Sequence, residues 1–385
     1  AGALVIVVGG PSCVSLSKAG KQGFASDPSS KHISNTLRVA AFFKADFVVI
    51  ENVPELLELD SIHGLRSAAL AEAASFGLLS VGHQLLRDSE VGGFTQRRRF
   101  FDFFESTSVS ARLPPWQPLS LPTSLPADLP SILLHEDDLD LGTLLQVRCE
   151  QAGSAIFKPS PALASHLALP AVADPFRSLR VGTLFWQPDR LALGAHIALV
   201  QPLVPSSFRT TPNRWVILDF DSSSCPRLLV RSADSARPST GWVSYSALSC
   251  FLQTRIPVYS ADRPAVTLRH YGDPPLGNSF ALLRGTSPDV FVTSLAPLEM
   301  WRAHGLSDHL AQTVLAEGGL VSDLGEIAGN CVTVASSDAM IGLLGSRVDS
   351  LRALTHSSPV ATLLPVVPEW VYLLQAGQTF SVCAS

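Results

Sequence analysis

The feature that most constrains this chain is a short apolar run near its N-terminus, Ala3–Val8, which is closed by Gly9-Gly10-Pro11. A β-branched run of this length that ends in turn residues predicts a buried strand followed by a tight turn. Cys13 stands two residues beyond that turn. Reactive groups gather in the loops at strand ends of α/β sheets, so Cys13 is a candidate nucleophile. The alternative is a small packing residue, because free cysteines are among the most buried residue types.

The first 112 residues alternate between predicted strands and helices. Strands are expected at Phe47–Ile50, Leu78–Leu86 and Phe100–Phe104, and helices over Gly64–Phe76 and around the apolar positions Ile33, Leu37, Ala40 and Phe43. Glu51-Asn52-Val53 follow the second strand, so we expect them to share a crevice with Cys13. Apolar strands that alternate with helices predict an α/β fold with a mostly parallel sheet covered on both faces.

The composition changes at about Leu113. Six prolines follow, Pro114, Pro115, Pro118, Pro122, Pro126 and Pro130, and short β-like segments then alternate with turn residues as far as about Gly285. This pattern predicts a separate, β-rich, irregular domain. Helical character returns from Thr293, with helices expected at Leu298–Leu306 and Val334–Leu344. We therefore divide the chain into residues 1–112, 113–289 and 290–350, with an unassigned tail at 351–385.

Length and composition indicate a globular protein of two or three domains. The chain has 385 residues, 46% of them apolar, and six cysteines that form no C-x-x-C pair. This cysteine usage argues against a zinc site or a disulfide framework and predicts an intracellular location, nuclear in a eukaryote. The cysteine spacing therefore predicts no metal. No apolar run approaches the roughly 20 residues that a membrane span needs, so no membrane is expected either.

The charge distribution says more than the net charge of −5. Residues 171–290 contain twelve Arg and eight Asp but neither Lys nor Glu, a net charge of +4. Arginine forks bind phosphates and guanine edges bidentately, so this segment is compatible with DNA binding. A GC-rich coding sequence would enrich Arg over Lys as well, and composition alone does not separate the two explanations.

Five motifs together resemble the cytosine-C5 DNA methyltransferase family. They are Gly9-Gly10-Pro11-Ser12-Cys13 with Ser17, Ala19, Gly20 and Lys21; Glu51-Asn52-Val53; Gly93–Arg99 (GFTQRRR); Leu295–Ser307 through Leu295, Glu299, Arg302 and Gly305; and Gly329–Val334 (GNCVTV). They are similar to the family's GGPPCQxFSxAGK, ENV, GxPQxRxR, LTxREx2RLQGFP and GNxVxV motifs, and they stand in the family's order. Each motif alone is weak, but five in order are specific.

The resemblance implies a Rossmann-like, S-adenosylmethionine-dependent methyltransferase with a target-recognition-like domain at 113–289. Residues 1–112 and 290–350 would then be parts of its catalytic domain. A thiolate at Cys13 would add to C6 of a cytosine flipped out of double-stranded DNA, and Glu51 would hold N3 and the exocyclic amine. An arginine among Arg97, Arg98 and Arg99 would hold the base or the loop.

The resemblance also implies binding residues around this site. Pro11, Asn330 and Cys331 would contact the S-adenosylmethionine cofactor, and Ser17, Lys21 and Gln96 would contact DNA. Which of the three arginines belongs to the site stays open, because the motif fits either without a gap at Arg98 or with a deletion at Arg97 and Arg99.

Departures from the family pattern bear on activity. Ser12, Val14 and Leu16 replace the usual Pro, Gln and Phe of the cysteine loop. The F-x-G-x-G turn that begins the family's cofactor half is not found, so we expect the N-terminal half of the sheet to be missing, with an exposed edge at the first strand. An upstream or separate chain would supply that half. The alternatives are an inactive DNA-binding or partner-binding module and a tRNA cytosine-5 methyltransferase.

Overall fold

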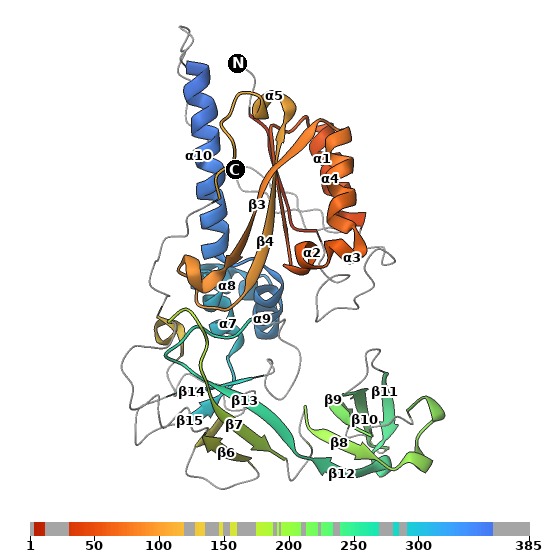
Figure 1. Ribbon diagram of the computed structural model, residues 1–385. Coiled ribbons are helices and arrows are strands. Elements are labelled where there is room, and N and C mark those ends of the chain that lie inside the picture. The colour runs from red at the N-terminus through yellow and green to blue at the C-terminus, as the bar shows by residue number, and fades with distance from the viewer. Residues whose placement is uncertain are drawn as a thin grey trace. The chain divides into compact units, whose positions relative to one another are not determined.

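The structure is a computed structural model that describes residues 4–11, 31–118, 128–134, 146–148, 155–159, 175–187, 191, 194–208, 213–221, 225–233, 239–268, 280–284 and 291–356. The chain divides into two compact units (Figure 1). The first unit takes in Ala1–Val91, Arg98–Thr123 and Ala335–Ser385, and the second takes in Gly92–Arg97 and Ser124–Val334. Each unit is described by itself below.

The first unit is built on a four-stranded sheet in the order β1-β2-β4-β3. Its strands are β1 (Ile6–Gly9), β2 (Phe47–Asn52), β3 (Leu78–Arg87) and β4 (Arg98–Ser106). β1 is parallel to β2, whereas β4 is antiparallel to both β2 and β3. Three strands therefore run in one direction and β4 alone is reversed, so the sheet is mixed rather than wholly parallel.

Helices cover one face of this sheet because their apolar residues recur at helical spacing. Ile33, Leu37 and Ala40 of α1 (Lys31–Phe42) and Ala73 of α4 (Leu65–Ser75) pack against β2 and β4. Phe43 was expected to continue this stripe, but α1 ends before it and its side chain is exposed. Figure 1 shows α1 and α4 on one side of the sheet and α10 (Val334–His356) on the other.

Short elements complete the first unit: α2 (Glu55–Glu58), α3 (Asp60–His63), η3 (Asp88–Val91) and α5 (Thr107–Ser110). On the α10 side, Trp116 lies 4.4 Å from the Phe103 ring, between ring centroids. A Cβ at Gly82 would collide with the Trp116 indole, so only glycine allows this approach. Arg347 of α10 donates to Glu105 of β4 at 2.8 Å and fixes the helix on this face.

The second unit is β-rich, and its described residues form two sheets. The first has the order β11-β10-β9-β8-β12, and the second β5-β15-β14-β13-β7-β6. Their strands are β5 (Gln146–Arg148), β6 (Ala155–Pro159), β7 (Arg180–Trp186), β8 (His196–Leu199), β9 (Trp215–Asp221), β10 (Arg227–Ser232), β11 (Thr240–Ser244), β12 (Leu248–Leu252), β13 (Thr254–Ser260), β14 (Ala281–Arg284) and β15 (Phe291–Thr293). Side chains from both sheets, including Leu184, Trp215 and Val258, form one buried cluster.

The second unit also contains short 3₁₀ turns and the helices α7 (Pro297–Ala303), α8 (Asp308–Ala316) and α9 (Val321–Asn330). The 3₁₀ turns are η4 (Leu129–Ile132), η6 (Gln201–Leu203), η7 (Ser206–Phe208) and η8 (Tyr245–Ala247). Residues 290–334 thus fall with the β-rich part of the chain, whereas the sequence placed 290–350 with the catalytic part. Apolar residues Leu295, Met300 and Ala303 share a buried cluster with Phe280 and Leu282, which explains this grouping.

One stretch of the described residues, Val321–Leu354, is long and apolar enough by length and composition alone to cross a membrane. It consists of α9 and α10, which are interrupted at Cys331–Thr333. α10 buries a stripe formed by Met340, Leu344, Val348 and Leu351, as a core helix does, so the composition of this stretch is weak evidence for a membrane span. Of the tail 351–385, the structure describes residues 351–356, which extend α10.

Candidate functional site

The ends of β1 and β2 meet at one edge of the first unit's sheet because the two strands are parallel. There Asn52 donates from Nδ2 to the carbonyl oxygen of Pro11 at 3.1 Å, and its Oδ1 accepts from the Val53 amide at 2.9 Å. Asn52 is buried, so these bonds satisfy a side chain that would otherwise be costly to bury. The motif pattern assigns Asn52 no role of its own, although its place at a strand end beside Glu51 is a signal in the sequence.

Glu51 lies at the same edge and contacts Arg99 of β4. The distance from Arg99 Nε to Glu51 Oε1 is 2.6 Å, and the side chains are only 11% and 15% exposed. Such a short, charge-assisted contact fixes the carboxylate strongly. A Cβ added to Gly10 would lie 3.3 Å from Glu51 Oε2, so the turn after β1 passes directly beside the carboxylate.

The three consecutive arginines have three different environments. Arg99 pairs with Glu51, as described, whereas Arg98 is exposed and lies 3.5 Å from Glu58. Arg97 belongs to the second unit, where it is buried and donates to the carbonyl oxygen of Leu268 at 3.0 Å. Of the three arginines left open by the sequence, Arg99 is therefore the one that pairs with Glu51.

Gln96, expected to contact DNA, is engaged within the second unit. Its backbone amide donates to the Ala265 carbonyl at 2.7 Å, and its side-chain amide donates to the Phe176 carbonyl. These bonds tie the segment before β4 to the β-rich unit. Cys13, Ser17 and Lys21, the other expected catalytic and DNA-contacting residues of the N-terminal loop, lie outside the described residues.

The residues expected to bind the cofactor are divided between the two units. Pro11 belongs to the first unit, whereas Asn330 and Cys331 belong to the second. Asn330 is exposed as the last residue of α9, and Cys331 Sγ lies 3.4 Å from the Ala328 carbonyl oxygen within its own helix. Pro11 thus offers a single carbonyl, Asn330 a surface amide, and Cys331 a thiol turned to its own helix. These groups do not fit a large cationic cofactor such as S-adenosylmethionine.

Asp102 is a buried carboxylate inside β4. It follows Phe101, the residue of β4 that pairs with Glu51, and Arg66 donates to its buried carboxylate at 2.8 and 3.1 Å. Burial raises the pKa of Asp102, and Arg66 and, more weakly, His83 counteract part of this effect. Since alternate residues of a strand point to opposite faces, this pair stabilises the α4 side of the sheet and is separate from Glu51.

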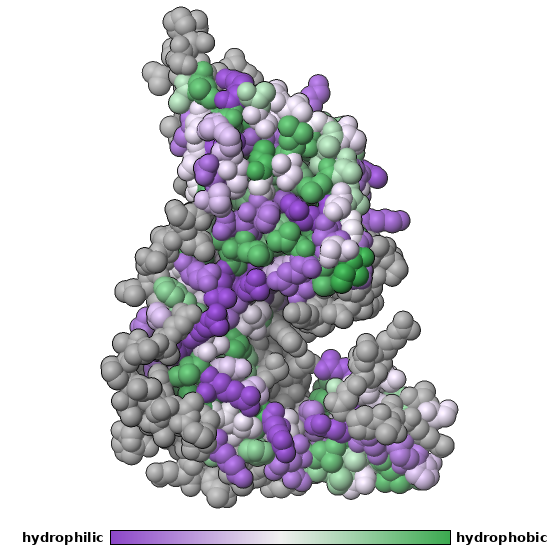
Figure 2. All heavy atoms as spheres, in the orientation of Figure 1, coloured by the Kyte–Doolittle hydropathy of each residue, from purple (hydrophilic) through white to green (hydrophobic). Residues whose placement is uncertain are grey.

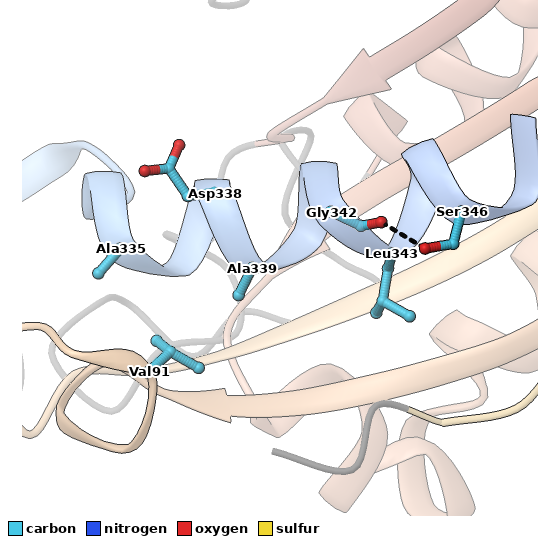
Figure 3. Close-up of a pocket in the computed structure, with 7 residues that line it drawn as sticks. All are labelled: Val91, Ala335, Asp338, Ala339, Gly342, Leu343 and Ser346. Carbon is cyan, nitrogen blue, oxygen red and sulfur yellow. Dashed lines mark hydrogen bonds between the residues drawn. The ribbon is translucent and has the colours of Figure 1, made fainter. Parts of the chain in front are cut away.

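A pocket of about 440 Å³ lies in the first unit between η3 and the N-terminal half of α10 (Figure 3). It is lined by Val91, Ala335, Asp338, Ala339, Gly342, Leu343 and Ser346. The Ser346 hydroxyl donates to the Gly342 carbonyl at 3.0 Å. Asp338 is the one ionisable residue among the described residues that line the pocket. Neither Glu51 nor any of the three arginines is among the described residues that line it.

Comparison with known proteins gives a match to the N-terminal segment. Residues 3–121 match the family model described as "C-5 cytosine-specific DNA methylase". This segment contains the cysteine loop, the Glu51–Arg99 pair and Asn52. No curated protein sequence matches the chain.

Similar solved structures include the Entamoeba histolytica methyltransferase EhMeth, with a TM-score of 0.49 and 10% identity over 89% of this chain and 77% of that one. The S. pombe Dnmt2 methyltransferase has a TM-score of 0.46 and 10% identity over 89% and 79%. A putative DNA modification methyltransferase from an E. coli prophage has a TM-score of 0.41 and 16% identity over 89% and 79%. Similarity at this level says nothing about substrate. The family model shows that residues 3–121 are similar to a C-5 cytosine-specific DNA methylase domain.

Proposed function

We propose that this chain carries the nucleophile-bearing part of a DNA cytosine-5 methyltransferase. The observation that supports this most directly is the Glu51–Arg99 pair, which lies beside the turn that leads into the cysteine loop. Asn52 holds Pro11 at the same place.

In this proposal Cys13 and Glu51 act on the two sides of one addition step. The Cys13 thiolate forms a bond to C6 of the cytosine, and the electron pair of the C5–C6 double bond shifts to C4–C5. The C4–N3 electron pair moves to N3, which takes a proton from the Glu51 carboxyl group. C5 thereby becomes an enamine-like, nucleophilic carbon. Flipping the base out of a duplex to reach this site costs a few kcal/mol.

Arg99 has a positioning role in this scheme. Its guanidinium fixes Glu51 from the neighbouring strand, so the carboxyl group that supplies the proton is held in place before the base arrives. Preorganisation of this kind removes a reorganisation cost from the reaction step. The other two arginines are engaged elsewhere, Arg98 beside Glu58 and Arg97 at the Leu268 carbonyl.

The methyl donor implied by the family is S-adenosylmethionine, and Pro11, Asn330 and Cys331 do not fit this cofactor by themselves. We propose that a preceding segment or a separate chain supplies that half at the edge of β1. Within the described residues, β1 pairs with β2 alone. Its side chains Ile6 and Val8 are 41% and 45% exposed, and Figure 2 shows other apolar residues scattered among polar ones on this unit. An open strand edge of this kind is a template for further pairing.

A second candidate is a catalytically inactive module that binds DNA or a protein partner. Two sequence observations favour it: the altered cysteine loop at Ser12, Val14 and Leu16, and the lack of an F-x-G-x-G motif in the given sequence. A tRNA cytosine-5 methyltransferase is the third. The three candidates differ in whether a covalent adduct forms and with which polymer.

The test is covalent trapping of the full-length protein by duplex DNA that contains 5-fluorocytosine, in the presence of S-adenosylmethionine. We expect a denaturant-stable protein–DNA adduct that Cys13→Ser abolishes. A matched RNA containing 5-fluorocytosine is expected to form none. Adduct with RNA only would assign an RNA substrate, and no adduct with either polymer would support the inactive module and overturn the proposal.

A further inference from the structure

The pocket between η3 and α10 has an apolar wall. Its volume is about 440 Å³. Figure 3 shows Ala335, Ala339 and Leu343 on the side of α10 that faces Val91 of η3, whereas the Asp338 carboxylate points away. The wall that faces η3 therefore carries no charge, and it favours an apolar occupant over a charged one.

Gly342 gives this pocket its room next to the backbone of α10. A Cβ added to Gly342 would meet no heavy atom within 4 Å. The Ser346 hydroxyl, one helical turn further on, donates to the Gly342 carbonyl at 3.0 Å and is thus satisfied within its own helix. An apolar side chain can therefore approach α10 closely here without leaving this hydroxyl unpaired.

The 29 residues that follow α10, 357–385, lie outside the described residues, but their sequence is strongly apolar. Sixteen of them are apolar, and Glu369 is the one charged side chain among them. Segments that remain disordered have the opposite composition, with low hydrophobicity and high net charge. Burial of this tail is therefore favourable, and it requires an apolar surface to pack against.

One part of the tail has the pattern of a segment that docks in an apolar groove. Trp370, Leu373 and Leu374 stand at the spacing of one helical face. Pro368 precedes them and Gly377 follows them, which are typical start and stop signals of a short helix. Apolar anchors at this spacing are the ones that an amphipathic helix inserts into a groove.

The chain is long enough for this segment to return to the pocket. α10 ends at His356, and Pro359 cannot continue it. Fourteen residues lead from His356 to Trp370, and such a stretch spans up to about 46 Å when it is extended. At the rise of an α-helix, Leu343 lies only about 20 Å from the end of α10. The tail can therefore fold back along the helix with chain to spare.

We propose that Trp370, Leu373 and Leu374 of the chain's own tail pack into the pocket between η3 and α10. Two independent features support this, the apolar wall of the pocket and an apolar tail that can reach it. The inference goes beyond the proposed function and does not depend on it, because Glu51 and Arg99 are not among the described residues that line the pocket.

Two glycines of α10 form a matched pair for the test. Gly342 lines the pocket, whereas Gly345, three residues further on, is not among its described lining residues. A Cβ at either position would meet no heavy atom within 4 Å. Leucine is also a better helix former than glycine, so neither leucine variant is expected to unfold α10. Only Gly342→Leu places a large side chain in the pocket.

The experiment is hydrogen–deuterium exchange of the full-length protein, followed by mass spectrometry. In the wild type we expect the backbone amides of residues 369–376 to exchange at least about ten-fold more slowly than those of an unstructured chain. Gly342→Leu should remove this protection, and Gly345→Leu should keep it. Exchange in β2 should be the same in all three proteins, which shows that the fold of the first unit is intact.

Four results would overturn the inference. Exchange of 369–376 at the rate of an unstructured chain in the wild type would show that the tail does not pack. Protection that survives in Gly342→Leu would place the tail elsewhere, and equal loss in both leucine variants would mean that the pocket is not the reason. Protection that falls on dilution would assign the tail to a second copy of the chain. Failure of the proposed function has a different signature, which is the lack of a covalent adduct with 5-fluorocytosine DNA.

Discussion

Two Glu–Arg pairs of equal length have opposite surroundings in this chain. Glu299 of α7 contacts Arg284 of β14 at 2.6 Å, and Glu51 of β2 contacts Arg99 of β4 at 2.6 Å. Glu299 is fully buried and accepts four hydrogen bonds, two from Arg284 and one each from the backbone amides of Leu134 and Ala296. Glu51 instead stands at a strand end, beside a glycine turn, and remains 15% exposed.

The difference shows how the same pair can serve architecture or chemistry. Both oxygens of Glu299 are occupied by donors from three segments, so this carboxylate joins β14, α7 and the segment at Leu134 and has nothing left for a ligand. Glu51 is held by a strand neighbour at the edge where loops open, which is where a substrate can reach it. The predictions below test this distinction, from the largest expected effect to the smallest.

Replacing Arg284 by Met should have the largest effect on stability. It leaves the buried Glu299 charge without its counter-ion, and breaking a buried pair from one side costs about 3–5 kcal/mol of unfolding free energy. The measurement is urea unfolding followed by tryptophan fluorescence, since Trp186, Trp215 and Trp301 are all buried in this unit. Arg302→Ala, on the same helix as Glu299 but in an exposed pair with Asp308, is the control and should cost under about 1 kcal/mol. Equal losses for the two variants would contradict the comparison.

Glu51→Gln should have a large effect on adduct formation and a small effect on stability, the reverse of what is expected for the Arg284 variant. It keeps the shape of the side chain but removes its charge and its proton-transfer capacity, which is worth about 10²–10⁴-fold in rate. We therefore expect adduct formation with 5-fluorocytosine DNA to slow by that factor, while the urea midpoint stays close to that of the wild type. A variant that loses stability as Arg284→Met does, yet still forms the adduct, would show that Glu51 is architectural.

Arg99→Lys and Arg98→Lys distinguish two adjacent residues. Lysine keeps the charge but loses the planar fork that fixes the carboxylate, so Arg99→Lys should slow adduct formation about ten-fold, as the loss of one charged hydrogen bond implies. Arg98 lies 3.5 Å from Glu58 on the surface, and its replacement should change the rate little. Equal effects on the adduct rate would mean that pairing with Glu51 does not decide which of the two arginines belongs to the site.

The sequence predicted most of the first unit because its signals are local. The strands at Phe47–Ile50 and Leu78–Leu86 and the helix at Gly64–Phe76 are confirmed within a few residues. The reversal of β4 was missed because periodicity shows that a strand exists and not its direction. The grouping of 290–334 was missed as well, since the hydrogen bonds between α7 and β14 join residues that no local pattern connects.

The candidate site was predictable in its residue types and not in its geometry. Motif order placed Glu51 and an arginine together, but three consecutive arginines satisfy the pattern equally well. Their separation depends on the transition from one unit to the other between Arg97 and Arg98 and on the alternation of β4. Gln96 likewise fits a DNA-contacting position by motif, although its amides bond to Ala265 and Phe176. Only tertiary structure distinguishes these cases.

Asp102 tests whether a full set of hydrogen bonds, rather than burial, is what distinguishes the Glu299–Arg284 pair from the Glu51–Arg99 pair. It is buried and paired with Arg66, but its hydrogen bonds within the described residues come from the side chains of Arg66 and Ser80, whereas Glu299 also accepts backbone amides. Burial therefore raises the pKa of Asp102 above its ordinary value of 3.8. The folded protein then holds this proton more tightly than the unfolded chain does, so the free energy of unfolding falls as the pH rises from about 3.8 through the raised pKa.

Asp308 contributes to the pH dependence of the free energy of unfolding with the opposite sign. Its hydrogen bonds with Arg302 lower its pKa, so its contribution to the free energy of unfolding is present above about 3.8 and is lost as the pH falls through the lowered value. We expect Asp102→Asn to remove a negative slope from the pH dependence of stability, and Asp308→Asn to remove a smaller positive one, since exposed pairs contribute under about 1 kcal/mol. Urea midpoints measured between acidic and neutral pH would detect both. A positive slope lost in Asp102→Asn would mean that Arg66 outweighs burial, and that a single arginine suffices to make a buried carboxylate as well satisfied as Glu299.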